Sequence, residues 1–412
     1  MFCSRTAIFF LLATAALAFG SERVIYSFNG GSDGAHPQAP LIADAGGNLY
    51  GAALEGGDAS CSAGCGTVFQ LAPPATRGGA WTKTTLYQFK GADGAGPEAG
   101  LILDKAGNLY GTTVSGGALG DGTVFELSPP TISGGAWTQT VLYSFKGGSD
   151  GSYPRSSVVF DALGNLYGET FFGGGSQNAG TVFQLVPPGT PGGTWTENVL
   201  HRFGSPDDGA QPISSLLIDQ RGALYGTAAL RYSSGGGAFF KLTPPTPGHT
   251  RWTETLLYVF NDQTDGDWPG DLILDRSGHL YGTNNLGGKK NCGTVFELIA
   301  PAQGGSWSAT ALHTFTGGDD GNLPTLRLAE DRQGNLYGTT TAGSNGSHDT
   351  VFKLTRPGSG GEWTKTILYQ FTGGRDGSDP EGGVVFGKFG LLYGTAYSGG
   401  ASGNGAIYAV AP

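Results

Sequence analysis

The sequence is poor in helix formers and in charge. Methionine occurs once in 412 residues, only 14% of the residues are charged, and glycine and proline occupy 76 and 22 positions. Glycine and proline weaken helices and supply turns, so this composition favours short strands joined by loops over a helical protein. The glycines recur in phase with Leu, Val, Phe and Tyr, which disfavours the alternative of a disordered chain.

Long apolar runs are missing outside the N-terminus. Residues Ala7 to Ala18 are almost wholly apolar and follow Arg5, and Ala16 and Ala18 form an A-x-A-like cleavage point. We therefore predict a secretory signal peptide at residues 1–20 and a soluble, exported domain at 21–412, placed outside the cell or in the periplasm. No later stretch approaches 20 apolar residues, so membrane insertion is not expected.

The sequence also lacks an excess of basic residues. The formal net charge is -10 at pH 7, and the isoelectric point is near 5.0. A protein that binds nucleic acid needs Lys and Arg to neutralise phosphates, so neither nucleic acid nor an anionic membrane is expected as a partner. The charge instead favours a soluble protein, which we expect to be a monomer.

Cysteines are few. Cys61 and Cys65 lie in one loop, and in an oxidising compartment we expect them to form a local disulfide. Cys65 and Cys292 both precede Gly-Thr-Val-Phe, so they have the same position in different repeats and should lie far apart. We therefore expect Cys292 to be unpaired. A metal site at Cys61 and Cys65 would need two further ligands nearby, and none is evident, so no metal site is predicted.

One pattern recurs seven times along the chain. Its Leu-Tyr-Gly signature recurs every 56 to 60 residues, at Leu49, Leu109, Leu166, Leu224, Leu280, Leu336 and Leu392. A fixed period of this length is typical of arrays, solenoids and propellers. One repeat contains four short runs rich in β-branched and aromatic residues, at 101–104, 109–113, 123–127 and 137–145. Four such strands predict a small antiparallel sheet, which must bury its faces against neighbouring sheets.

The numbers of the four runs predict how the sheets assemble. The fourth run ends in Phe and occurs seven times. Its first copy, 24–28, comes before the first sheet, and the last repeat has no fourth run of its own. We therefore predict an all-β, seven-bladed propeller of four-stranded antiparallel blades. In it the N-terminal strand 23–28 completes the last blade beside 406–410, which leaves no open edge.

The repeat also resembles a known family. The patterns W-T-x-T-x-L-Y-x-F-x-G-G-x-D-G-x-x-P, D-x-x-G-N-L-Y-G-T-T and G-G-x-x-x-x-G-T-V-F-x-L look like the GloVer (Gloeo_Verruco) tandem repeat of exported bacterial proteins. The likeness covers essentially the whole of 21–412. It implies a bacterial surface or secreted protein with no established enzymatic role.

The repeated acidic residues have a simple structural interpretation. Each repeat contains Asp-Gly-x-x-Pro, and a tight turn that connects neighbouring blades explains this better than a ligand site. Six repeats also place an Asp before a Gly-Asn-type turn, where its carboxylate would accept local backbone N–H groups. The alternative is a ring of carboxylates that binds Ca²⁺, although no loop has EF-hand or nonapeptide spacing. No other cofactor is predicted.

The variable positions around the repeated Pro are the candidate binding residues. In a propeller the loop before the first strand of each blade opens at the central channel. We therefore predict that one mouth of the channel is lined by His36, Gln38, Glu98, Tyr153, Arg155, Gln211, Trp268, Asp271, Arg327, Asp379 and Glu381. Mixed charges with exposed aromatic rings suit a polar ligand, such as an extracellular glycan or a protein segment. The alternative is a rim that is merely solvated.

Sequence motifs for catalysis are absent. No G-x-S-x-G elbow, H-E-x-x-H helix or phosphate-binding loop occurs, and His36 is the one His placed near the channel mouth, so no catalytic residue is predicted. Three functions stay open. The first is a binding or scaffold module. The second is a hydrolase or lyase that uses paired carboxylates such as Glu98 and Glu381. The third is a purely structural surface protein.

Overall fold

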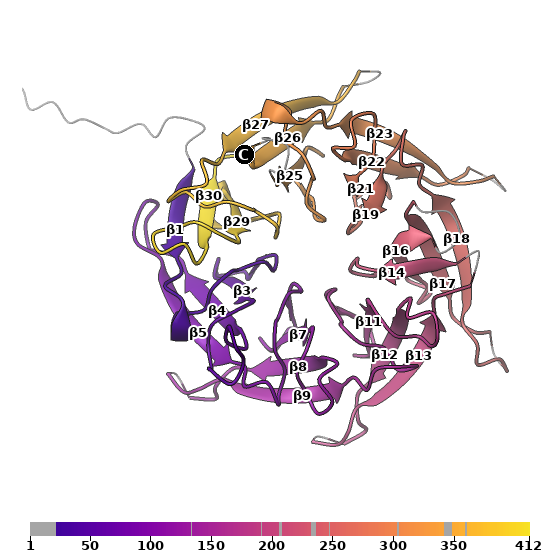
Figure 1. Cartoon of the computed structure of the whole chain (residues 1–412), viewed down its shortest axis with the longest axis horizontal. Coiled ribbons are helices and arrows are strands. Elements are labelled where there is room, and N and C mark those ends of the chain that lie inside the picture. Colours follow the sequence, from indigo (N-terminus) through magenta and orange to yellow (C-terminus); the bar gives the residue numbers. More distant parts are fainter. Residues whose placement is uncertain are drawn as a thin grey trace, which may run out of the picture.

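The chain forms a ring of seven antiparallel sheets, arranged like the blades of a propeller around a central axis (Figure 1). This computed structural model describes residues 22–412 except 133, 191, 206–207, 232–235, 247, 303–304, 342–347 and 359–360. The predicted fold class is confirmed. The predicted signal peptide at 1–20 lies outside the described residues. Within them, no helix is long and apolar enough to cross a membrane.

Four blades each consist of four strands in chain order, from the channel to the rim. Blade 1 contains β2 (Ile42–Ala43), β3 (Leu49–Ala53), β4 (Thr67–Ala72) and β5 (Thr82–Gln88). Blade 2 contains β6 (Ile102–Leu103), β7 (Leu109–Thr113), β8 (Thr123–Ser128) and β9 (Thr138–Ser144). Blade 3 contains β10 (Val159–Phe160), β11 (Leu166–Thr170), β12 (Thr181–Val186) and β13 (Thr196–Arg202). Blade 6 contains β24 (Ala329–Glu330), β25 (Leu336–Thr340), β26 (Thr350–Thr355) and β27 (Thr364–Gln370).

Two blades have an innermost strand that is split in two. In blade 4, β14 (Gly209–Pro212) and β15 (Leu217–Ile218) both pair with β16 (Leu224–Arg231), followed by β17 (Ala238–Thr243) and β18 (Thr253–Val259). In blade 5, β19 (Asp267–Pro269) and β20 (Ile273–Leu274) both pair with β21 (Leu280–Leu286), followed by β22 (Thr294–Ile299) and β23 (Ser308–Thr314).

Blade 7 combines both ends of the described chain. Its sheet has the order β1 (Arg23–Ser27), β30 (Ala406–Val410), β29 (Leu392–Ala396) and β28 (Val384–Phe386). Strand β1 runs antiparallel to β30, with Val24 opposite Tyr408 and Ser27 opposite Ala406. The segment after β1 leads directly into blade 1, so the first residues belong to the last blade (Figure 1).

Phenylalanine side chains connect neighbouring blades. Phe89 follows the outer strand of blade 1 and stacks edge to face on Phe125 in blade 2, with ring centroids 5.0 Å apart. Both rings are fully buried. This packing explains why the Leu-Tyr-Gly signature needs a glycine, because a Cβ at Gly111 would lie 2.7 Å from the Phe125 ring. The glycine therefore makes room for the ring, and the same contact recurs around the propeller.

The repeated acidic side chains have the structural role expected from the sequence. Asp44 accepts hydrogen bonds from the Asn48 backbone N–H and side-chain amide, at 2.9 and 2.7 Å. Equivalent backbone bonds occur at Asp104, Asp161, Asp219, Asp275 and Asp331. The Asp of each Asp-Gly-x-x-Pro turn accepts from the Tyr or His of the preceding outer strand; for example, the Tyr143 hydroxyl lies 2.7 Å from Asp150.

Candidate functional site

Seven turns with an unusual backbone surround one mouth of the channel. The residue before each repeated Pro has a left-handed backbone, with φ between 49° and 67°, at His36, Gly96, Tyr153, Gln211, Trp268, Leu323 and Asp379. Six of these are not glycine, and such a conformation costs of order 1–3 kcal/mol each. At six of the seven turns the backbone N–H of this residue donates a hydrogen bond to the preceding blade, as from Gly96 N–H to the Cys65 carbonyl at 3.0 Å. These bonds hold the strained turns against the neighbouring blade.

These turns enclose a cavity of about 420 Å³ on the ring axis. All seven blades contribute to its wall. It is lined by Gln38, Pro40, Glu98, Ala99, Gly100, Arg155, Ser156, Ser157, Ile213, Ser215, Trp268, Asp271, Asn285, Leu323, Thr325, Leu326, Arg327, Thr341, Glu381 and Gly382. A cavity of this size fits a small ligand or a short segment of a polymer.

Seven of the eleven residues expected at the mouth line this cavity. They are Gln38, Glu98, Arg155, Trp268, Asp271, Arg327 and Glu381. The four others, His36, Tyr153, Gln211 and Asp379, precede the Pro and are not part of the cavity wall, unlike Trp268 and Leu323, which have the same left-handed backbone. His36, for example, stacks on Tyr397 with ring centroids 4.6 Å apart. Their part in ligand binding stays a prediction, as it does for the lining residues.

Glu98 is the centre of a polar cluster on one wall. One carboxylate oxygen accepts a hydrogen bond from the Tyr153 hydroxyl at 3.1 Å, and the other lies 3.3 Å from the Arg155 guanidinium. Burial raises the pKa of Glu98 above its usual value, although Arg155 and Tyr153 both act to lower it. Tyr153 lies outside the cavity wall but holds Glu98 in place.

Glu381 brings a second carboxyl group into the cavity. The Glu381 side chain is in contact with solvent, but it lies on a concave wall with protein on several sides. The resulting loss of hydration is the main cause of its raised pKa. The carboxylate of Asp379 and that of Glu98 add to the shift, whereas a hydrogen bond with Gln38 opposes it. Two carboxyl groups with raised pKa values thus share one cavity, which marks them as candidate functional groups.

Arg327 extends across the ring axis from blade 6 toward blade 2. Its guanidinium Nη1 would lie 3.2 Å from a Cβ added to Gly100 on the opposite side of the ring. Within the described part of the chain, the Arg327 guanidinium forms no ion pair and no hydrogen bond. Unlike Arg155, which faces Glu98, it is therefore a cation that the protein itself leaves available to a ligand.

Trp268 supplies the flat apolar surface of the cavity. Its side chain packs against the buried cluster of Phe171, Ile213 and Ala229, and its indole also lines the cavity. Its backbone N–H donates to Asp267 at 2.7 Å, which fixes the turn. A partly buried indole beside Arg and carboxylate groups is typical of sites that bind sugars or peptides.

A belt of hydrogen bonds connects blades 4, 5 and 6 below the cavity. The Asp271 carboxylate accepts from the Ser215 backbone N–H at 2.6 Å, and the Asp271 N–H donates to the Leu326 carbonyl at 2.7 Å. Ser215 and Leu326 were missed by the sequence reasoning, although both follow the repeated Pro by two or three residues. Asn285 lies near the end of β21 and Thr341 directly follows β25, and no pattern in the sequence marks them.

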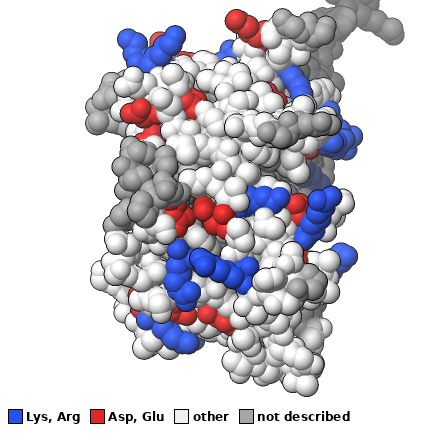
Figure 2. Space-filling view, turned by 90° about the vertical axis from the view of Figure 1, so that its right-hand side faces the viewer, with Lys and Arg blue, Asp and Glu red and all other residues white. Residues whose placement is uncertain are grey.

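The remaining candidate residues lie away from this cavity. Cys61 and Cys65 form a disulfide with Cα atoms 5.1 Å apart, and Cys292 is a free, buried cysteine. His201 and His313 take the place of the repeated Tyr, and their rings contact Asp208 and Asp320 at 3.2 and 3.1 Å. On the rim near blades 4 and 5, acidic and basic side chains are interspersed (Figure 2).

Solved structures with similar folds have diverse activities. An ulvan lyase of polysaccharide lyase family PL25, bound to a GlcA–Rha3S oligosaccharide, is 11% identical over 94% of this chain and 95% of its own, with a TM-score of 0.53. PorZ, a surface component of the type-IX secretion system of Porphyromonas gingivalis, is 17% identical over 93% of this chain, with a TM-score of 0.48. This chain spans 47% of PorZ. At these identities the likeness shows the fold alone.

Family membership comes from the sequence itself. No curated protein matches the chain. A family model, however, matches it over residues 8–194, 131–300 and 174–408, and these matches together include all seven repeats. The chain therefore belongs to the Gloeobacter/Verrucomicrobia repeat family.

Proposed function

We propose that this protein is an exported binding module whose axial cavity takes a segment of an extracellular polysaccharide. Export is supported by the predicted signal peptide at 1–20 and by the Cys61–Cys65 disulfide, which suits an oxidising compartment. The observation that carries the proposal is the composition of the cavity wall. It joins one indole face, one unpaired guanidinium and the carboxyl groups of Glu98, Asp271 and Glu381 in about 420 Å³.

Each group has a part in this proposal. The Trp268 indole would stack on the apolar face of a sugar ring, and Arg327 would donate to a sugar hydroxyl or to a carboxylate or sulfate on the polymer. Glu98 and Glu381 would accept from hydroxyl groups. Because burial raises the pKa values of both groups, and the charge of Asp379 adds to the shift of Glu381, acidic conditions would protonate them and favour anionic polymers.

We expect Trp268→Ala and Arg327→Ala each to weaken polysaccharide binding at least about tenfold, as is usual for a central contact residue. The measurement is a glycan array, followed by titration calorimetry on the strongest ligand. His36→Ala and Gln211→Ala are matched controls, because both residues have the same left-handed backbone before Pro but lie outside the cavity wall. Equal losses in all four variants would contradict the site. If the cavity binds a protein but no glycan, the proposed ligand class would be wrong and the proposed binding site would still hold.

A second function, hydrolysis or elimination on the same polymer, is favoured by the two carboxyl groups with raised pKa values in one cavity. If this function holds, Glu98→Gln and Glu381→Gln will each lower the release of oligosaccharides by at least about a hundredfold. Chromatography of digested extracellular polymers measures the product. Asp379→Asn is the control, since Asp379 lies beside Glu381 but outside the cavity wall. If the protein binds the polymer but releases no product, the result would support a binding module. If it neither binds nor releases product, the result would support a purely structural protein.

A further inference from the structure

All seven junctions between blades share one arrangement on the outer side of the ring. An aromatic residue of one outer strand donates to the Asp of the turn that follows, and a residue near the start of the next outer strand completes the junction. This third residue faces the same Asp except where it is Ala309, whose backbone bonds to Tyr258 instead. We call these three residues the junction triad. The triads are Tyr26–Asp33–Lys83, Tyr87–Asp93–Gln139, Tyr143–Asp150–Glu197, His201–Asp208–Glu254, Tyr258–Asp265–Ala309, His313–Asp320–Lys365 and Tyr369–Asp376–Glu22.

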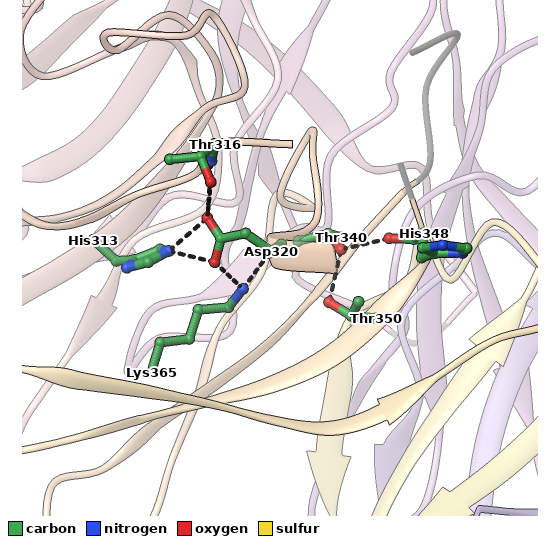
Figure 3. A network of polar contacts seen from close by, with 7 residues as sticks. All are labelled: His313, Thr316, Asp320, Thr340, His348, Thr350 and Lys365. Carbon is green, nitrogen blue, oxygen red and sulfur yellow. Dashed lines mark hydrogen bonds and ion pairs between the residues drawn. The ribbon is translucent and has the colours of Figure 1, made fainter. Parts of the chain in front are cut away.

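Two triads contain their own cation. Lys365 lies 2.7 Å from an Asp320 carboxylate oxygen, and His313 and Thr316 donate to the same carboxylate (Figure 3). The Lys365 side chain is only 7% exposed, so the ammonium group is held inside the junction. Lys83 pairs with Asp33 in the same way at 2.8 Å. At these junctions a positive charge therefore neutralises the buried carboxylate.

The junction between blades 3 and 4 has a carboxylate where those two junctions have Lys. Glu254 faces Asp208, and among the described residues no Lys or Arg forms an ion pair with either group. The Asp208 residue is only 3% exposed, and one oxygen of Glu254 is buried without a hydrogen-bond partner. Burial and the charge of Asp208 raise the pKa of Glu254. A buried carboxylate next to a half-buried one needs a cation or a proton between them.

A nitrogen ligand completes this cluster. His201 replaces the Tyr found in five of the triads, and its Nε2 lies 3.2 Å from both oxygens of Asp208. One ligand atom from each of His201, Asp208 and Glu254 lies within 4.8 Å of the other two. In a tetrahedral zinc site, Zn–N and Zn–O bonds of about 2.0–2.1 Å separate two ligand atoms by about 3.3 Å. The 3.2 Å between His201 Nε2 and the Asp208 oxygens matches this spacing, and the Glu254 ligand atom lies within 4.8 Å of both residues' ligand atoms.

We propose that His201, Asp208 and Glu254 bind a Zn²⁺ ion that fastens blade 3 to blade 4, with water in the remaining coordination position. The ion would take the place that the ammonium groups of Lys83 and Lys365 occupy at their own junctions. An imidazole with two carboxylates suits Zn²⁺, whereas Ca²⁺ prefers oxygen ligands alone. Asp208 also accepts from the Gly204 and Gly209 backbone N–H groups, which orient it for the ion.

The test uses tag-free protein of residues 21–412, stripped with EDTA and then given ZnCl₂ at pH 7. Calorimetry should show one Zn²⁺ per chain, and the melting temperature should rise by about 3 °C at one hundred times the dissociation constant. His201→Tyr should lose this response and still fold, because Tyr at this position donates to the equivalent Asp at five other junctions. Glu254→Lys should also lose it, and its metal-free melting temperature should exceed that of the wild type.

His313→Tyr is the matched control, since His313 occupies the same position beside Lys365, and it should keep the full zinc response. Zinc binding that survives in His201→Tyr, or that is lost equally in His313→Tyr, would overturn the proposal. Failure of the wild type to bind one Zn²⁺ per chain would overturn the proposal as well. The two carboxylates of Asp208 and Glu254 would then share a proton instead. A response to CaCl₂ that equals the response to ZnCl₂ would contradict the role of the imidazole.

Discussion

Phe28→Ala is expected to lower the free energy of unfolding by about 3–5 kcal/mol, as is usual for truncation of a buried Phe. Phe28 is fully buried, and its ring packs edge to face on Phe69 of blade 1 at 5.2 Å. Its backbone N–H donates to the Gly405 carbonyl of blade 7 at 3.0 Å. The residue therefore joins the last blade to the first, although it lies near the start of the described chain.

Phe145→Ala is the matched control for this prediction. Phe145 has the same place after its outer strand, is also fully buried, and packs on Phe183 at 5.1 Å. Urea-induced unfolding, followed by tryptophan fluorescence, measures both variants. If β1 holds the ring together, the two losses will be similar in size. A loss near zero for Phe28→Ala, beside a large loss for Phe145→Ala, would show that β1 contributes little to the closed ring.

Glu169→Thr is expected to raise the free energy of unfolding by about 2–4 kcal/mol at pH 7.5, because a buried carboxyl group without partners is costly. Glu169 is 1% exposed, and neither carboxylate oxygen has a hydrogen-bond partner. The equivalent position is Thr in five other blades. There the hydroxyl donates to a carbonyl of the next blade, as from Thr283 to Thr325 at 2.7 Å. The substitution restores that contact and removes the carboxyl group.

The size of this effect depends on pH. Burial, and then the charge of Asp271, raise the pKa of Glu169 well above its usual value. A raised pKa means that the folded state binds the proton more tightly than the unfolded state. The contribution of Glu169 to stability is therefore fully present below about pH 4 and is lost as the pH rises toward the folded pKa, by at most about 1.4 kcal/mol per pH unit. Glu169→Thr will lack this loss.

Urea-induced unfolding of the wild type and Glu169→Thr between pH 4.5 and 7.5 measures this difference, which should widen as the pH rises. Thr283→Glu is the reverse control, because it places the same carboxyl group at the equivalent position of blade 5 and should destabilise the protein. A constant difference across the pH range would contradict the raised pKa. A Glu169→Thr variant that is more stable but binds its ligand less well would indicate that Glu169 is retained for function.

The repeat made the fold predictable. Seven copies of the Leu-Tyr-Gly signature and of the run ending in Phe determine the number of blades, and each copy repeats the same buried and exposed positions. Asp44 and Asp150 illustrate why the residue roles could be predicted too. A carboxylate next to a turn has local donors, so its partners lie within a few residues in the sequence.

The candidate site could be predicted only in part. Glu98, Trp268 and Arg327 vary among the repeats near the repeated Pro, and this variation marked them as candidates. His36 was marked for the same reason but packs on Tyr397 of blade 7. Its backbone does not distinguish it from Trp268, which has the same left-handed conformation before Pro and lines the cavity. Asn285 carries no mark at all, because it lies in the part of β21 that extends beyond the five-residue strands found at this place in other blades.

The sequence by itself determined the blade, because strand periodicity, turn residues and the packing of Phe on Gly act within one repeat or between adjacent ones. Tertiary structure alone decided which side chains meet across the ring, such as Arg327 and Gly100, and which buried groups lack partners, such as Glu169 and Glu254. The physical reason is that a local pattern specifies how a strand pairs. The distance between side chains of different blades depends instead on how all seven sheets close around the axis.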